Sequence, residues 1–440
     1  MKQLFIIILL IHSLPSLGQE NIHLSMEEAV KYGLENHTSI QMAANNIEYY
    51  ERNTVIKKSA YLPEIISSAD YRNNLALPVT ILPGDIFGRA EGPVEIKMGT
   101  RHNLQSGINI HQTLFNAAIS STIRQAGIEE KMAANNLSTT RKNIAMEIRS
   151  AYLLCLYNLE LLQIIKNNVD TYAMLAGAAS VKHENGLSSD SELEDALNRE
   201  ETGKLELRIK RGRYDNSIRQ LKLKMDYPSD KDIILSDSTL QDIVCNRSLM
   251  DKAHDIRRLP AWIELSLQEQ MNHEKQKMLW GRYLPSFDLY GFLGAQYYDE
   301  NFSPLTNEQR WFGQSYIGLS MNLPLFEGGK KKRNRQALII LEKNIATEKE
   351  RLEKEISQRS EIIKTEFALS HQKADLTDTE LKRATGKLND AAADYKTGIT
   401  SYSNVLRADL DMRLKKQEYV SALYDIMLRL IEYKQLVSVY

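Results

Sequence analysis

The sequence predicts a mixed α and β fold: a long α-helical barrel of coiled-coil hairpins, continuous with a transmembrane β-barrel that several chains close together. Three observations predict it. They are an export signal at the N-terminus, helical stretches too long for an ordinary globular domain, and four short segments in which apolar residues alternate with polar ones.

Residues 1–18 have the pattern of a secretory signal peptide. One positive charge at Lys2 precedes an apolar run from Leu4 to Ile11, and small residues at Ser16 and Gly18 predict cleavage after Gly18. The alternative, a membrane anchor, needs roughly 20 apolar residues. Because no later run of about 18 apolar residues follows, we expect the mature chain to cross a membrane with strands.

Charge and cysteine content exclude several classes of protein. The 440 residues carry 56 Lys and Arg against 57 Asp and Glu, so no nucleic-acid partner is expected. The basic run 330–335 is instead expected beside lipid headgroups of the outer membrane. Cys155 lies on the apolar side of a predicted helix, and whether it pairs with Cys245 stays open.

The sequence contains an internal duplication. Ala60-Tyr61-Leu62-Pro63 recurs as Arg282-Tyr283-Leu284-Pro285, and two further landmarks recur in the same order at near-constant spacing. The period is too long for a solenoid repeat, which indicates two copies of a half-domain. The expected division is a signal peptide at 1–18, a first repeat at 19–225, a linker or equatorial segment at 226–247 and a second repeat at 248–440.

Each repeat is expected to contain one short helix and one long helical hairpin. The first helix begins after Ser25, with Glu28 completing a capping box, and runs to about Ser59. The long hairpins are expected at 118–182 with 188–225, and at 331–395 with 401–434. Apolar residues in the first follow a 3.5-residue period, which is typical of supercoiled helices. Such a helix would be roughly 95 Å long.

Four segments of about ten residues alternate like transmembrane β-strands. Ile317, Leu319 and Met321 alternate with polar or small residues in a run extending to Leu325, and Ile108 and Ile110 do the same in the first repeat. The alternative is a soluble antiparallel sheet with one wet face. Four strands cannot close a barrel and would leave unpaired edges in hydrocarbon, so several chains must join. Physical arguments alone do not distinguish a trimer from a tetramer.

These features resemble the TolC-like outer-membrane efflux proteins across nearly the whole mature chain. The motifs that carry the resemblance are the helix start at 24–30, the two Tyr-Leu-Pro strand entries, Leu325-Phe326-Glu327-Gly328-Gly329, and the two hairpin tips Glu184-Asn185-Gly186-Leu187 and Lys396-Thr397-Gly398-Ile399. Each motif is weak alone, and their order and duplication make the match specific.

The resemblance implies a homotrimer whose barrel is closed by three chains with four strands each, in the outer membrane, with a long periplasmic extension. It implies a passive exit duct of a tripartite efflux pump for small toxic compounds or drugs. The implied partners are a periplasmic adaptor protein and an inner-membrane pump of the RND type. Two alternatives remain: an exit duct for type I protein secretion, and an exported coiled-coil structural protein.

The resemblance also implies two sets of functional residues. The hairpin tips would contact the adaptor, although their glycines can equally serve only to turn the chain. Family members often close the entrance with an Asp ring, where this chain has Asn404 and Arg407, so an acidic ring is not expected. The adaptor-contact candidates are Asn185, Gly186, Leu187, Thr397, Gly398 and Ile399, and the gate candidates are Asp190, Glu192, Asn404 and Arg407.

No enzyme chemistry is expected. The nine histidines have no ligand spacing, no carboxylate pair stands out as an acid–base couple, and there is no phosphate-binding glycine loop or nucleophile elbow. We therefore predict no catalytic, cofactor-binding or metal-binding residue.

Overall fold

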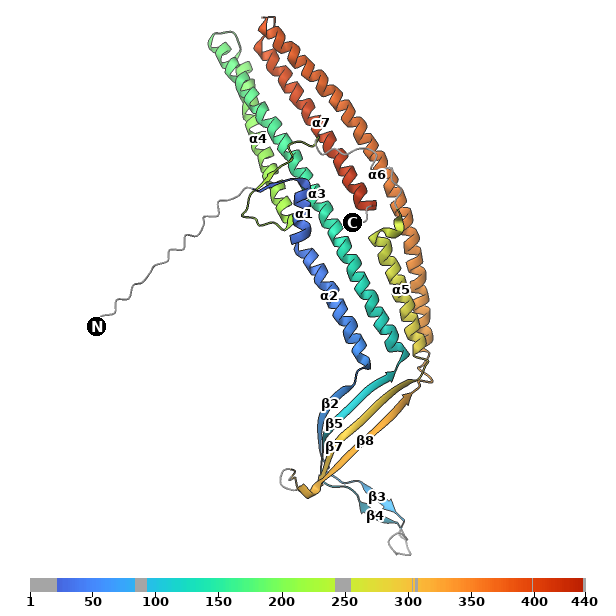
Figure 1. Ribbon diagram of the computed structural model, residues 1–440. Helices are drawn as coiled ribbons and strands as arrows, with labels where there is room; N and C mark the ends of the chain where they lie inside the picture. The colour runs from blue at the N-terminus through green and yellow to red at the C-terminus, as the bar shows by residue number, and fades with distance from the viewer. Residues whose placement is uncertain are drawn as a thin grey trace, which may run out of the picture. The chain divides into compact units, whose positions relative to one another are not determined.

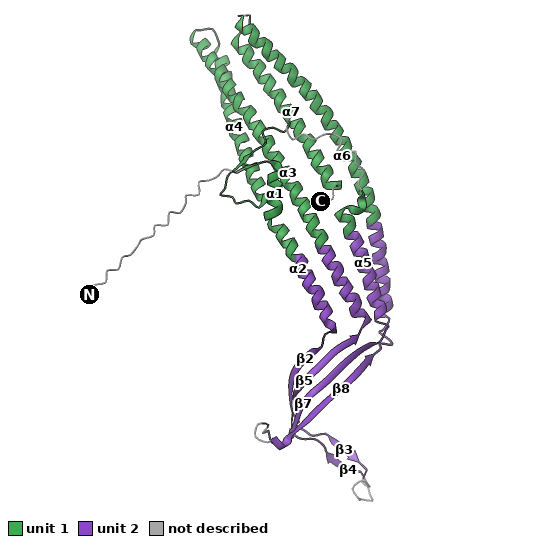
Figure 2. Cartoon of the chain, in the orientation of Figure 1, with its two compact units in different colours: residues 1–45, 134–263, 349–440 green, residues 46–133, 264–348 purple. Residues whose placement is uncertain are grey.

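The computed structural model describes residues 22–83, 93–241, 255–302, 304, 308–397 and 399–437. The predicted signal peptide, Cys245 and Gly398 lie outside these residues. The chain divides into two compact units, coloured separately in Figure 2: residues 1–45, 134–263 and 349–440 form unit 1, and residues 46–133 and 264–348 form unit 2. Both units draw on both predicted repeats, whose boundaries stay a prediction.

The described chain is mostly helical, with four long strands and four short ones (Figure 1). The helices are α1 Met26–Asn36, α2 Thr38–Lys58, α3 Ala117–Glu184, α4 Asp190–Met225, α5 Pro260–Gly281, α6 Lys330–Lys396 and α7 Tyr402–Val437. The strands are β1 Ile22–Leu24, β2 Glu64–Asn73, β3 Val79–Leu82, β4 Val94–Lys97, β5 His102–Phe115, β6 Ile233–Leu235, β7 Ser286–Asp299 and β8 Trp311–Asn322.

The predicted first helix begins where expected but is interrupted. Ser25 caps α1, and the Glu28 side chain bonds back to the Ser25 backbone N–H, completing the capping box. The expectation of one continuous helix is wrong at His37, which has an extended backbone and ends α1. The next N–H, on Thr38, donates to Asp226 Oδ2 at 3.0 Å, and this bond lowers the pKa of the Asp226 carboxyl.

The core of unit 1 lies along one face of α3. Ile148, Leu153 and Leu156 are fully buried there, together with Leu221 and Met225 from α4. Helix α1 approaches α3 at Gly33, where an added Cβ would collide with the Ile148 side chain. Glycine at this position leaves room for the end of the Ile148 side chain, which would have to move for any larger residue.

Tyr152 connects three segments in the middle of that core. Its side chain is fully buried, and its hydroxyl lies 2.9 Å from the carbonyl oxygen of Leu24 and 2.7 Å from Asp237 Oδ2. The same Asp237 oxygen accepts the backbone N–H of Met26 at 3.0 Å. Strands β1 and β6 pair in parallel beside it, so the N-terminal segment and the described part of the linker pack together on α3.

Cys155 is a core residue, as the apolar pattern predicts. It is a free, fully buried thiol in the part of the chain that the structure describes, and burial raises its pKa to about 12.

One segment of α3 is more apolar than the sequence analysis expected. An 18-residue window of this helix reaches a mean hydropathy of 1.2, and 56% of the window is buried. This helix meets the criteria for a membrane span by length and composition only. The buried core helix of a soluble bundle meets the same criteria.

Unit 2 contains a four-stranded antiparallel sheet in the order β2-β5-β7-β8. Its register confirms the predicted alternation, because Ile108, Leu293 and Ile317 share one face with the exposed side chains of Ile65, Ile110, Leu319 and Met321. We call this the apolar face and the opposite side the polar face. Strand β8 ends at Asn322 instead of Leu325, since Pro324 has no N–H to donate.

A second, smaller sheet was not anticipated. Strands β3 and β4 form an antiparallel pair between β2 and β5, in addition to the four predicted strands. The alternation Val94-Glu95-Ile96-Lys97 is the sequence signal that could have revealed it.

We predict that Tyr152→Phe destabilises unit 1 by about 1–2 kcal/mol, because the Leu24 carbonyl and the Asp237 carboxylate each lose one of their hydrogen bonds in the core. The measurement is the urea midpoint of the helical circular-dichroism signal. Tyr49→Phe is the control, since Tyr49 is exposed on α2. Equal midpoints for the two variants would contradict the role assigned to the Tyr152 hydroxyl.

Candidate functional site at the hairpin tips

The first hairpin reverses at Asn185 and Gly186. Gly186 has φ of 70°, in the left-handed region that glycine adopts without strain. Its N–H donates to the carbonyl of His183, and the N–H of Leu187 donates to that of Lys182, both at 2.8 Å. This is the Schellman pattern that ends α-helices. The Asn185 side chain donates to the Val181 carbonyl at 2.7 Å, so the turn is internally satisfied.

The second hairpin closes with the same bond. The N–H of Ile399 donates to the carbonyl of Asp394 at 2.8 Å, which matches the bond from Leu187 to Lys182 in the first hairpin. The Thr397 hydroxyl donates to the Asp394 carbonyl at 3.0 Å. Gly398, the counterpart of Gly186, lies outside the described residues.

Each tip presents one apolar side chain to solvent. Leu187 and Ile399 are each 76% exposed, which is high for residues of this size. No internal packing explains their identity, so the two tips offer matched apolar contacts on otherwise polar turns.

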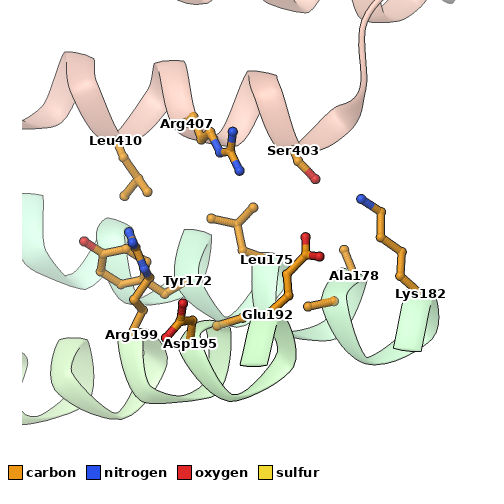
Figure 3. A pocket seen from close by; sticks show the side chains of 12 residues that line it. Tyr172, Leu175, Ala178, Lys182, Glu192, Asp195, Arg199, Ser403, Arg407 and Leu410 are labelled. Atoms are coloured by element: carbon orange, nitrogen blue, oxygen red, sulfur yellow. The ribbon is translucent and has the colours of Figure 1, made fainter. Parts of the chain in front are cut away.

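A cavity of about 280 Å³ lies just below the tips, between α3, α4 and α7 (Figure 3). Two of the four gate candidates, Glu192 and Arg407, line this cavity. Asp190 and Asn404 do not line it: Asp190 lies 3.5 Å from His183 Nε2, and the Asn404 side chain donates to Thr400 Oγ1 at 2.9 Å.

Three further charged residues line the same cavity and were missed by the sequence analysis: Lys182, Asp195 and Arg199. The spacing of Glu192, Asp195 and Arg199 places them on one face of α4, a signal that was present in the sequence. Among the described residues, no ion pair within 4.0 Å joins any of these five charged groups. The cavity is thus lined by three cations and two carboxylates.

Asp409, the first carboxylate along α7, already has an ion-pair partner and a hydrogen-bond partner. Its Oδ2 lies 2.8 Å from Arg413 and accepts the Thr171 hydroxyl at 2.9 Å, which ties α7 to α3. Within the described residues, no cluster of three or more His, Cys, Asp or Glu has the arrangement of a metal site.

The fold is that of solved outer-membrane channels. The chain superimposes on VceC of Vibrio cholerae with a TM-score of 0.72 at 13% identity, covering 94% of this chain and 95% of that one. It superimposes on the CmeC channel of Campylobacter jejuni with 0.68 at 16% identity (94% and 85% covered). For the open MtrE channel of Neisseria gonorrhoeae the score is 0.69 at 14% identity (94% and 88% covered).

The family comparison agrees with the fold. Residues 30–224, which lie within the first predicted repeat, match the family described as outer membrane efflux protein. No curated protein matches the chain. The resemblance drawn from the sequence is thereby confirmed, and the expected location in the outer membrane agrees with the family's description.

Proposed function

We propose that this protein is the outer-membrane exit duct of a tripartite efflux pump. Three chains close a twelve-stranded barrel, and their helical hairpins form a periplasmic tunnel. The duct passively conducts small toxic compounds or drugs, delivered by a periplasmic adaptor and an inner-membrane pump of the RND type. It performs no chemistry on its cargo.

The four-stranded sheet is the observation that carries this proposal. Its outer strands, β2 and β8, each have one edge without a partner within the described chain. Its apolar face is exposed at residues such as Leu293, Ile317 and Leu319. An apolar exposed face suits hydrocarbon, where unpaired strand edges are not tolerated, so neighbouring chains must supply the missing strands.

The helices of unit 1 support the same association. Ile362, Leu369 and Leu376 follow each other at seven-residue spacing on α6, and each is more than half exposed. A heptad-spaced apolar stripe needs a partner helix, and a neighbouring chain is the partner that cyclic closure provides.

The two tips are the proposed adaptor contacts. The support is their shared closing hydrogen bond and the matched exposure of Leu187 and Ile399. Asn185, Gly186 and Thr397 shape the turns that carry these two side chains, and Gly398 is a further proposed contact by its match to Gly186 in the sequence.

The charged cavity is the proposed gate. Closure would bring Arg407 and its neighbouring cations onto Glu192 and Asp195, and opening would separate them. Asp190 and Asn404 would act at the rim, nearer the turns.

The function is tested by membrane fractionation and cross-linking in the native host, together with a deletion strain. We expect an outer-membrane trimer and a several-fold fall in the inhibitory concentrations of several drugs on deletion. A soluble periplasmic monomer would overturn the duct. Unchanged susceptibility together with loss of an exported protein would favour type I secretion instead.

For the tips, we expect Gly186→Trp and Gly398→Pro to reproduce the drug susceptibility of the deletion strain while the trimer stays intact, because the adaptor loses its contact surface. The control is Gly212→Trp on α4, where an added side chain also has open space around it. Normal resistance in both tip variants would argue against docking there.

For the gate, we expect Arg407→Glu to raise the conductance of purified trimers in planar bilayers several-fold. The change gathers three carboxylates around the cavity and repels the helices from one another. Combining it with Glu192→Arg should restore the low conductance, and Lys387→Glu, outside the cavity, should leave it unchanged. Identical conductance in all variants would refute a gate at this cavity.

A further inference from the structure

The polar face of the sheet carries a group of aromatic rings. Residues two apart on a strand share a face, so Asp288, Tyr290 and Phe292 of β7 all lie on the polar face. The register places Tyr316 of β8 directly opposite Phe292. This face lies opposite the exposed apolar face, so it borders the lumen in the closed barrel that we propose.

Glycines on the same strand and on the neighbouring strands leave room for two of these rings. An added Cβ at Gly107 or at Gly294 would lie 2.7 Å from Phe292 Cζ. An added Cβ at Gly318 would lie 2.6 Å from the Tyr290 hydroxyl oxygen and 2.9 Å from Cε1. Each ring therefore lies against the backbone of the sheet, where only glycine leaves room for it. Rings held in this way line a wall without blocking the passage.

The three rings differ in solvent exposure: one is buried and two are accessible. Phe292 is 3% exposed, whereas Tyr290 is 41% and Tyr316 is 48% exposed. The Tyr316 ring stacks on Phe292, with centroids 5.8 Å apart, and meets Tyr290 edge-on at 6.1 Å. Two tyrosines thus keep nearly half of their surface available while the third ring supports them.

A carboxylate lies on the same face, two residues before Tyr290 on β7. Asp288 Oδ1 accepts the Thr113 hydroxyl at 2.8 Å and lies 3.8 Å from His111 Nε2. The polar face of the described strands also carries the carboxylates of Glu64 and Asp70 and the cation Arg72, so negative charge exceeds positive charge on this face. Aromatic faces next to a carboxylate are the surroundings that attract organic cations.

We propose that Tyr290, Tyr316 and Asp288 form a weak transit site for aromatic organic cations, repeated three times around the lumen. The proposal rests on the proposed function, since it needs three chains to close the barrel with this face inward. The rings attract a flat hydrophobic group, and the carboxylate attracts its positive charge. The site is open and shallow, so cargo binds without being retained.

The test is block of single purified trimers in planar bilayers by benzyltrimethylammonium and by tetramethylammonium, added on the barrel side. We expect the aromatic cation to block at a concentration roughly five-fold lower, the factor that an exposed cation–π contact provides. The double variant Tyr290→Leu/Tyr316→Leu should abolish this difference, and Tyr290→Phe/Tyr316→Phe should keep it. Asp288→Asn should weaken block by both cations.

Leu319→Ala, on the apolar face, is the matched control and should change neither block. If the rings serve only to pack against the glycines, the leucine variants will lower the melting temperature of the trimer and leave the cation preference intact, which overturns the site. Conducting trimers without any preference for the aromatic cation also overturn it and leave the duct standing. Absence of conducting trimers overturns the duct, and the transit site with it.

Discussion

Hydrocarbon offers no hydrogen-bond partner to a backbone amide, and this constraint governs the architecture of the duct that we propose. A single chain supplies a sheet of four strands whose outer members, β2 and β8, remain half paired. Within lipid, such edges are satisfied only when sheets join end to end into a closed ring. In the duct that we propose, the requirement for neighbouring chains therefore originates in the sheet, and the exposed heptad stripe of α6 would let the helices follow the same symmetry.

The helical unit solves a different problem, which is how to hold very long helices in register. Helices that contact each other only through apolar stripes can slide by a heptad with little change in packing. Tyr152 and Asp237 make specific polar contacts in the middle of α3, and the short β1–β6 pair adds a directional backbone ladder. Gly33 allows α1 to approach the Ile148 side chain of α3 closely at one turn of the helix. These contacts define one alignment.

Much of this organisation could be predicted from local patterns. The period-two alternation around Ile317 assigned the apolar face correctly, and Ser25 with Glu28 located a helix start, because both signals lie within a few residues of each other. The break at His37 depends on Asp226, far along the chain, and no local pattern contains it. The cavity could not be predicted for the same reason. Glu192 and Arg407 were singled out separately from the sequence, and only the packing of α4 near α7 shows which other charged residues line the same cavity.

The strand order has a consequence for biogenesis. Strand β5 comes from the first half of the chain and its partner β7 from the second, so the ladder between them joins residues such as Ile108 and Leu293. A chain delivered N-terminus first would present β2 and β5 long before β7 and β8 arrive. During that interval, apolar strands with an open edge invite aggregation. For an exported chain this edge stays open until β7 and β8 have also been translocated.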